Sequence, residues 1–332
     1  MKYNFAVVGA GAWGTALANL LAKLNDGNVI VWAKENQVIN SINNSKKNEL
    51  YLPKITLEKN IYATNNIEEV VASYVFYVTP AQYFHSVLTL HKNVLCKSSS
   101  VVICSKGIDI KSGFLMSKIY KDIFSNDNFL VLSGPSFAYE IAKGLPAALT
   151  LASPDIQAAI KLSSIISSRN FRLYPSNDVI GVQLGGAIKN IYAIGSGIVK
   201  GLNYGDNAGA AFLTRSIAEI IKICEILGGK KDSIFGLSGV GDVLLTSSSN
   251  KSRNFMLGSF IGKGENINNI LKNNITVAEG YFTAKALYLI LKKKNIETPI
   301  LDGIYNILYN SYTVEDAVNS LLDRPLKYNE FD

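Results

Sequence analysis

Short hydrophobic runs alternate with longer helical patterns along the first half of the chain. Runs that predict buried strands occupy residues 5–8, 28–32, 61–64, 74–78, 101–104, 129–132, 147–152 and 171–174. Between most of them, apolar residues recur at the spacing of a helix. This alternation predicts an α/β fold with a Rossmann-type, doubly wound, mostly parallel sheet, whose ligand crevice lies at the carboxyl ends of the strands.

The pattern changes after Pro175. From Asp178 onward, long apolar periods at helical spacing predict helices. The joints between them are rich in Gly or Asn, at residues 203–207, 236–241 and 266–274. We therefore expect two domains: a dinucleotide-binding Rossmann domain at residues 1–177 and an all-helical substrate-binding domain at residues 178–332.

The longest apolar stretch, residues 180–202, contains one lysine near its middle. The residues one helical turn apart are Gly181, Gly185, Lys189, Ala193 and Gly197. Lys189 is thus the only long side chain in a row of small ones. Glycine inside a helix costs about 1 kcal/mol relative to alanine, so the row indicates close backbone packing or space for a ligand beside the lysine.

Three interpretations of this stretch differ in what Lys189 does. A membrane span is disfavoured because Gln183, Lys189 and Asn190 interrupt the apolar run. A buried core helix is an ordinary alternative. An ammonium there needs partners or loses its proton, however, and lysines with a lowered pKa act as proton donors and acceptors. We expect Lys189 to be a catalytic acid/base.

A glycine-rich turn follows the first predicted strand. Gly9, Gly11 and Gly14 form the pattern G-x-G-x-x-G, with Ala12 and Trp13 between the last two, and a helical pattern begins directly afterwards. Such glycines allow a tight turn and close backbone approach, and the start of the helix receives a pyrophosphate. The pattern alone is weak, but its place between a strand and a helix predicts dinucleotide binding.

The end of the second predicted strand bears on cofactor choice. Enzymes committed to NAD usually carry an acidic residue there, to hold the ribose hydroxyls. This chain has Trp32-Ala33-Lys34-Glu35, with the acid one residue late. Lys34 either faces the 2′-phosphate of NADP or merely opens a solvated helix, and both alternatives stay open at this point.

Two places in the helical half carry candidate chemistry. Asp242 follows a glycine-rich turn, and Thr246 comes one helical turn later on the same predicted face. Ser252 precedes an apolar helical run and is expected to cap it. The free amides of that helix and the Arg253 guanidinium would then hold a phosphate. The alternative for Arg253 is a solvated surface charge.

The composition narrows the class of protein but does not indicate an activity. The chain has 332 residues, 48% of them hydrophobic, which suffices for two cores. Its net charge of +7 comes from dispersed lysines, so an anionic small molecule accounts for it as well as nucleic acid does. The three scattered cysteines show no metal-ligand spacing and fit a reducing cytoplasm, and the start of the chain does not resemble a secretory signal. We expect a cytoplasmic protein with no metal, no nucleic acid and no integral membrane contact.

Many short motifs, in order, resemble one family over nearly the whole chain. The bacterial NAD(P)-dependent glycerol-3-phosphate dehydrogenases are similar in the segments GAGAWGTALA, YLP, VTPAQ, SKGI, SGPSFA, AIKN, GLNYGDN, GLSGVGD, SRN and VAEG. The resemblance implies interconversion of dihydroxyacetone phosphate and sn-glycerol 3-phosphate, which supplies the backbone of phospholipids. It also suggests a homodimer. The departures are small: Ala12 replaces a usual serine, and Gly209 replaces a position that is often basic.

The resemblance also implies roles for individual residues. Lys189 matches the proton acceptor of alcohol oxidation, assisted by Lys106 and Asp242. The expected substrate-binding residues are Lys106, Gly134, Ser136, Lys189, Asn190, Asp242, Thr246, Ser252, Arg253 and Asn254. The expected cofactor-binding residues are Gly9, Gly11, Ala12, Trp13, Gly14, Lys34, Lys106, Ala138, Arg253, Val277 and Glu279. The cofactor is expected to be NAD(P)H, with NADPH accepted or preferred.

Two rival functions stay open. Another lysine-dependent, two-domain dehydrogenase, of the hydroxyacid or phosphogluconate type, would share the architecture. A nucleotide-sensing module without turnover would keep only the Rossmann half in use. The segment from Ser252 to Asn254 favours a glycerol phosphate over the first rival, and the presence of Lys106, Lys189 and Asp242 argues against the second.

Overall fold

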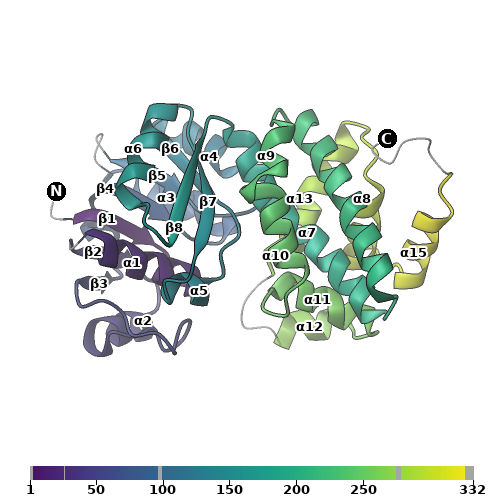
Figure 1. Cartoon of the computed structure of the whole chain (residues 1–332), viewed down its shortest axis with the longest axis horizontal. Coiled ribbons are helices and arrows are strands. Elements are labelled where there is room, and N and C mark those ends of the chain that lie inside the picture. Colours follow the sequence, from purple (N-terminus) through teal and green to yellow (C-terminus); the bar gives the residue numbers. More distant parts are fainter. Residues whose placement is uncertain (1–2, 26, 96–98, 274–277, 326–332) are drawn as a thin grey trace. The chain divides into compact units, whose positions relative to one another are not determined.

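A computed structural model describes residues 3–25, 27–95, 99–273 and 278–325. The chain divides into two compact units, which are coloured along the sequence in Figure 1. The first comprises Met1–Ser105 with Met116–Val179, and the second comprises Lys106–Leu115 with Ile180–Asp332. The sequence prediction placed residues 106–115 in the first domain, whereas in the structure they belong to the second unit. Ile108 is buried in the core of the second unit, so this segment is part of that core.

All eight described strands belong to the first unit and form one sheet. They are β1 (Tyr3–Val8), β2 (Val29–Trp32), β3 (Ile61–Thr64), β4 (Ala72–Tyr77), β5 (Ser100–Ile103), β6 (Phe129–Ser133), β7 (Ala147–Ala152) and β8 (Phe171–Ser176). Their order is β3-β2-β1-β4-β5-β6-β7-β8. The first six strands are parallel, whereas β7 runs antiparallel to β6 and parallel to β8. The predicted strands are confirmed, with bounds within two residues.

Helices cover both faces of this sheet. They are α1 (Ala12–Asn25), α2 (Asn36–Asn40), α3 (Ala81–His91), α4 (Met116–Phe124), α5 (Ala138–Ala142) and α6 (Ile156–Ile166), with short turns at Ser41–Ser45 and Ile67–Glu69. Leu17 and Leu21 of α1 share a buried core with Val7 of β1. On the opposite face, Tyr77 packs edge to face against Phe84 of α3. The sheet is therefore doubly wound, as predicted.

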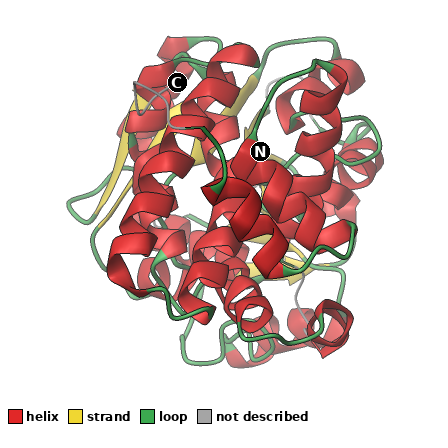
Figure 2. Ribbon diagram, turned by 90° about the vertical axis from the view of Figure 1, so that its right-hand side faces the viewer, coloured by secondary structure: helices red, strands yellow, loops and turns green. Residues whose placement is uncertain are grey.

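The second unit is helical (Figure 2). Its helices are α7 (Val179–Gly201), α8 (Gly205–Ile226), α9 (Lys231–Phe235), α10 (Asp242–Ser247), α11 (Arg253–Gly262), α12 (Ile267–Asn273), α13 (Glu279–Lys293), α14 (Pro299–Tyr309) and α15 (Val314–Leu322), with a helical turn η3 at Leu237–Gly241.

The three predicted joints hold more helix than the sequence suggested. Most of the joint predicted at residues 266–274 is helix, and residue 274 lies outside the described residues: α12 occupies Ile267–Asn273, the Asn266 side chain accepts from the amide of Asn268, and Ile270 is buried. Helix α8 already begins at Gly205, and η3 fills most of residues 236–241.

Helix α7 is the centre of the second unit, and its glycines serve backbone packing. A Cβ on Gly197 would lie 2.0 Å from the carbonyl oxygen of Phe255 in α11. In return, a Cβ on Gly258 of α11 would lie 1.9 Å from the carbonyl oxygen of Ile194. At Gly185, the backbone of η3 fills the space, since a Cβ would lie 2.5 Å from the oxygen of Ser238. Of the two expectations for these glycines, close packing is the one observed.

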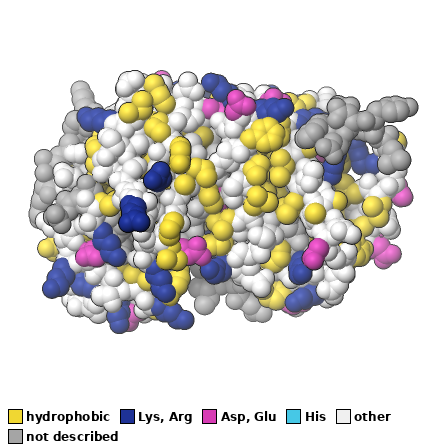
Figure 3. All heavy atoms as spheres, viewed as in Figure 1, with side chains coloured by type: hydrophobic (Ala, Val, Ile, Leu, Met, Phe, Trp, Pro, Cys, Tyr) yellow, Lys and Arg dark blue, Asp and Glu magenta, His cyan; other side chains and the backbone are white. Residues whose placement is uncertain are grey.

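The surface agrees with a dispersed charge. On the face in Figure 3, Lys and Arg side chains are spread among acidic, polar and hydrophobic ones. None of the described helices is both long enough and apolar enough to span a membrane.

Candidate active site

The glycine-rich turn between β1 and α1 forms a cradle whose shape requires glycine. Gly9 has φ +114°, and a Cβ there would lie 3.0 Å from the backbone of Val78 at the end of the neighbouring strand β4. A Cβ on Gly14 would lie 1.9 Å from the oxygen of Gly9, so α1 begins directly on the turn. Beside Gly11, by contrast, no heavy atom other than those of Gly11 and its chain neighbours lies within 4 Å of a Cβ position. Open space next to the first amides of α1 fits a dinucleotide diphosphate.

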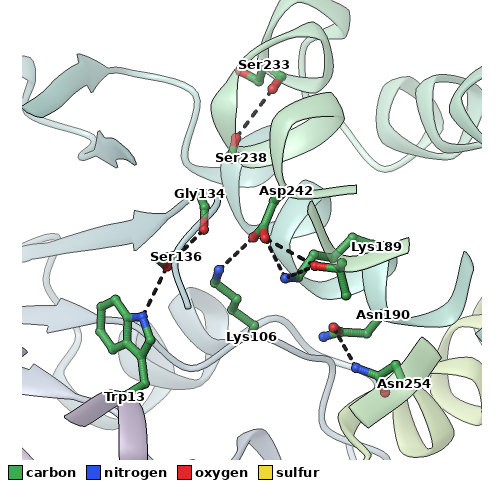
Figure 4. A network of polar contacts seen from close by, with 11 residues as sticks. Trp13, Lys106, Gly134, Ser136, Lys189, Asn190, Ser233, Ser238, Asp242 and Asn254 are labelled. Atoms are coloured by element: carbon green, nitrogen blue, oxygen red, sulfur yellow. Dashed lines mark hydrogen bonds and ion pairs between the residues drawn. The ribbon is translucent and has the colours of Figure 1, made fainter. Parts of the chain in front are cut away.

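Trp13 and Ser136 are linked inside the first unit. The indole Nε1 donates to Ser136 Oγ at 3.1 Å, and that hydroxyl donates to the oxygen of Gly134 at 3.1 Å (Figure 4). Trp13 lies at the start of α1, whereas Ser136 lies between β6 and α5, which Ala138 begins. Two residues expected to contact different ligands are therefore coupled, and no spacing in the sequence could have indicated this.

Lys34 lies in an exposed bend directly after β2. Helix α2 begins only at Asn36, with Glu35 at its N-cap position. The hydroxyl of Tyr51 donates to Glu35 Oε1 at 3.3 Å, which fixes that carboxylate beside Tyr51. Lys34 thus carries the exposed positive charge nearest in sequence to the end of β2, where a ribose substituent is recognised in this fold.

Lys189 is the centre of a buried ionic network in the second unit. Its Nζ donates to Asp242 Oδ1 at 2.6 Å and to Thr246 Oγ1 at 2.7 Å (Figure 4). The other carboxylate oxygen, Asp242 Oδ2, accepts from Lys106 Nζ at 2.7 Å. The side chain of Asp242 is 1% exposed, that of Lys189 10% and that of Lys106 22%. Asp242 and Thr246 lie on one face of α10, as predicted, and one carboxylate serves two ammonium groups.

Burial lowers the pKa of Lys189 from its ordinary value to about 8. The charge and hydrogen bond of Asp242 raise this pKa, while the positive charge of Lys106 lowers it. A lysine with a pKa near neutrality exchanges its proton readily at physiological pH. The network is therefore suited to acid–base chemistry on a bound substrate.

The segment of Lys106–Leu115 holds Lys106 in this network. Ile108 is buried and pairs in a short antiparallel bridge with Leu115, so the segment forms a closed loop. The carboxylate of Asp109 accepts from the amide and hydroxyl of Ser112 and fixes the turn. The domain boundary predicted from the sequence missed this loop because it lies between β5 and α4 in the chain.

Ser252 caps α11, as predicted from the sequence. Its hydroxyl accepts from the amide of Phe255 at 3.2 Å, and Arg253 is exposed at the first position of the helix. Next to it, Asn254 Nδ2 donates to Asn190 Oδ1 at 2.9 Å, while Asn254 Oδ1 accepts from the amide of Gly280 at 3.0 Å. The start of α11 is thereby tied to the residue that follows Lys189.

The remaining predicted residues are placed as follows. Glu279 is the first residue of α13, and Val277 lies outside the described residues. The buried His91 is structural: its Nε2 donates to the oxygen of Val70 and its Nδ1 accepts from Tyr77. Within the described part of the chain, no group of three or more His, Cys, Asp or Glu is arranged to hold a metal ion.

Comparisons with known proteins agree on one family. The model of the NAD-dependent glycerol-3-phosphate dehydrogenase N-terminus matches residues 4–159, and that of the C-terminus matches residues 178–319. The chain is 40% identical over 325 residues to a glycerol-3-phosphate dehydrogenase [NAD(P)+] of Parvibaculum lavamentivorans, covering 98% of this chain and 97% of that one. It is 41% identical over 326 residues to the Rhodospirillum rubrum protein of the same name, covering 98% and 93%.

A solved structure extends this agreement to three dimensions. The crystal structure of glycerol-3-phosphate dehydrogenase from Coxiella burnetii superposes with a TM-score of 0.92 at 32% identity, covering 97% of this chain and 99% of that one. The residues matched by the two family models include the glycine-rich turn as well as the helices that carry the lysine network. The chain belongs to the NAD-dependent glycerol-3-phosphate dehydrogenase family.

Proposed function

We propose that this protein is an NAD(P)-dependent glycerol-3-phosphate dehydrogenase in which Lys189 is the general acid/base. The reaction interconverts dihydroxyacetone phosphate and sn-glycerol 3-phosphate. The observation that carries the proposal is the buried Lys106–Asp242–Lys189 network in a member of this family. Its lysine has a pKa near 8, as a proton donor at physiological pH requires.

In the reduction, the ketone gains a hydride at its carbonyl carbon and a proton at its carbonyl oxygen. NAD(P)H, held at the glycine-rich turn, would supply a hydride to the carbonyl carbon. The Lys189 ammonium donates its proton to the carbonyl oxygen, which becomes the hydroxyl of the product. In the oxidation, neutral Lys189 accepts that proton back. Both directions therefore depend on Lys189, each through a different protonation state.

Asp242 and Lys106 set the conditions for this proton transfer. Asp242 holds the Lys189 ammonium in one place through Oδ1, and Thr246 fixes it from a second side. The two ammonium groups outnumber the single carboxylate by one positive charge. That excess favours an anionic substrate and stabilises the negative charge that develops on the carbonyl oxygen.

The capped start of α11 is the proposed phosphate site. Its first amides carry the positive end of the helix dipole, and Arg253 adds an exposed guanidinium that can bind phosphate with two parallel hydrogen bonds. The Asn190–Asn254 bond ties this site to α7 beside Lys189. A phosphate held there would fix the reactive carbon relative to the lysine.

The cofactor residues belong to the proposal as well. Gly9, Gly11, Ala12, Trp13 and Gly14 would hold the diphosphate, and Lys34 would face a 2′-phosphate, which favours acceptance of NADPH. Gly134, Ser136, Ala138 and Glu279 are assigned their ligand contacts by family resemblance. The same resemblance supports a cytoplasmic homodimer whose product, sn-glycerol 3-phosphate, supplies the backbone of glycerophospholipids. Sedimentation of the purified protein tests the dimer.

A substrate panel with NADPH tests the proposed function against its rivals. Dihydroxyacetone phosphate should oxidise NADPH rapidly, as followed by the loss of its absorbance, whereas 2-oxo acids and phosphogluconate with NADP should not react. Turnover of a hydroxyacid pair instead would favour the related dehydrogenases. Binding of NADPH without turnover of any of these substrates would favour a nucleotide-sensing module.

A further inference from the structure

Asn48 is a fully buried polar residue behind the glycine-rich turn. Its side chain is 0% exposed, yet it lies in the irregular segment that follows α2, far from α1 in sequence. Asn48 Nδ2 donates to the carbonyl oxygen of Ala10 at 2.8 Å and to Thr15 Oγ1 at 2.8 Å. Thr15 Oγ1 in turn donates to the same Ala10 oxygen at 3.2 Å, which closes a triangle.

The orientation of the Asn48 amide is set by its other partner. Asn48 Oδ1 accepts from the amide of Tyr51 at 3.1 Å, and a backbone amide can only donate. The NH₂ group must therefore face Ala10. The backbone of Asn48 is fixed as well, because its oxygen accepts from the amide of Leu52 at 2.8 Å. This side chain is a rigid donor aimed at one carbonyl of the turn.

The hydrogen bonds to the Ala10 oxygen also fix the direction of the Gly11 N–H, because both groups belong to one peptide. The peptide is planar and trans, so its C=O and N–H point in opposite directions. When Asn48 and Thr15 hold the Ala10 oxygen in the interior, the N–H of Gly11 points away from them. The space beside the Gly11 Cα is open as well, because no heavy atom other than those of Gly11 and its chain neighbours lies within 4 Å of a Cβ position.

We propose that Asn48 is a positioning residue for the cofactor, which orients the Gly11 N–H toward the dinucleotide diphosphate by holding the Ala10 carbonyl from behind. The inference rests on the proposed function only in taking a diphosphate-bearing dinucleotide as the ligand. Amides fixed in advance toward an anion bind it without a further cost of ordering the turn. Thr15 alone supplies a single, longer bond to this carbonyl and leaves the peptide freer to rotate.

The test compares Asn48→Ala with Asn19→Ala. Asn19 is a matched control, because it is also a buried asparagine of the first unit and also binds a loop amide, that of Glu58 at 2.9 Å. Within the described residues, the Asn19 side chain forms no hydrogen bond to the glycine-rich turn. Dissociation constants are measured for NADPH and for adenosine 2′-monophosphate, which shares the adenosine end but lacks the diphosphate. Thermal unfolding of each variant is measured in parallel.

Asn48→Ala should raise the dissociation constant of NADPH about tenfold, which corresponds to about 1.4 kcal/mol. That of adenosine 2′-monophosphate should change less than about twofold, and Asn19→Ala should leave both constants near wild type. A purely structural role would weaken both ligands equally or affect only the unfolding temperature, and either result would overturn the proposal.

A second variant keeps the test decisive if Asn48→Ala does not fold. Thr15→Val keeps the shape of the side chain but removes the other donor to the Ala10 oxygen. It should also weaken NADPH more than adenosine 2′-monophosphate, and equal effects on the two ligands would contradict the inference. A wild-type protein that binds neither NADPH nor NADH would instead overturn the proposed function, and this positioning role with it.

Discussion

Replacing Asp242 with Asn should lower the pKa of Lys189. The carboxylate lies 2.6 Å from Lys189 Nζ, and its charge is what holds this pKa as high as about 8 against the effect of burial. An opposite charge at such a distance shifts a pKa by about 1 to 3 units. Without it, the Lys189 pKa should fall to roughly 5 to 7, since burial and Lys106 both act in that direction.

The assay is the pH dependence of kcat/KM for oxidation of sn-glycerol 3-phosphate. Oxidation needs neutral Lys189, so the wild-type rate should rise with pH through about 8. In reduction the protonated form is needed, so the rate should fall over the same range. For Asp242→Asn, the inflection of the oxidation profile should move down by at least about one pH unit, together with a loss of maximal rate from poorer positioning of the lysine.

Thr246→Val is the matched control for this prediction. It removes the other hydrogen-bond partner of Lys189 Nζ, at 2.7 Å, without changing any charge. Its inflection should stay much closer to that of the wild type. Titration of the substrate phosphate is common to all variants, so it cancels in the comparison. An inflection that stays at the wild-type pH in Asp242→Asn, or moves upward, would refute the electrostatic account of Lys189.

Three other substitutions probe the proposed phosphate site, the proposed cofactor site and the packing of α7. Arg253→Ala should lower kcat/KM for dihydroxyacetone phosphate at least about tenfold at saturating NADPH, through loss of a bond worth about 1.5 to 3 kcal/mol. Unphosphorylated dihydroxyacetone should be affected much less, and an unchanged ratio between the two substrates would move the phosphate site elsewhere. Lys34→Asp should weaken NADPH far more than NADH, whereas Lys59→Asp, an equal charge change at an exposed site of the same unit, should not; equal effects of Lys34→Asp on both cofactors would remove Lys34 from the site. Gly258→Ala should lower the free energy of unfolding in urea by about 1 to 3 kcal/mol or more, because its Cβ would lie 1.9 Å from the Ile194 oxygen. Gly209→Ala, in open space, should be neutral or slightly stabilising, and similar losses for both variants would contradict the packing argument.

The parts of the fold that depend on local pattern could be predicted from the sequence. Strand positions, the glycine-rich turn before α1 and the Ser252 cap are encoded within a few residues, and each is present in the structure. The prediction of a joint was wrong for residues 267–273, which form α12, because polar composition was taken for a joint. Asn266 lies at the start of this helix, and Ile270 and Ile267 anchor that helix in the core.

Most contacts between segments that are distant in the chain could not be predicted from the sequence. The row containing Lys189 indicated a lysine that needs partners, but not that one carboxylate would bind Lys106 as well. The loop at residues 106–115 belongs to the second unit through its packing, which no boundary in composition marks. The sequence analysis did not single out Asn48, because its hydrogen bond is to a carbonyl 38 residues away in the sequence.

Turnover by Lys189→Met tests the central claim most directly. Methionine has a similar length but no ionisable group, so the fold and NADPH binding should be preserved. We expect NADPH-dependent reduction of dihydroxyacetone phosphate to fall at least about a hundredfold at saturating substrate and cofactor, with the dissociation constant of NADPH near that of the wild type. A folded, NADPH-binding Lys189→Met protein that turns over within a few-fold of the wild-type rate would contradict the assignment of Lys189 as the acid/base.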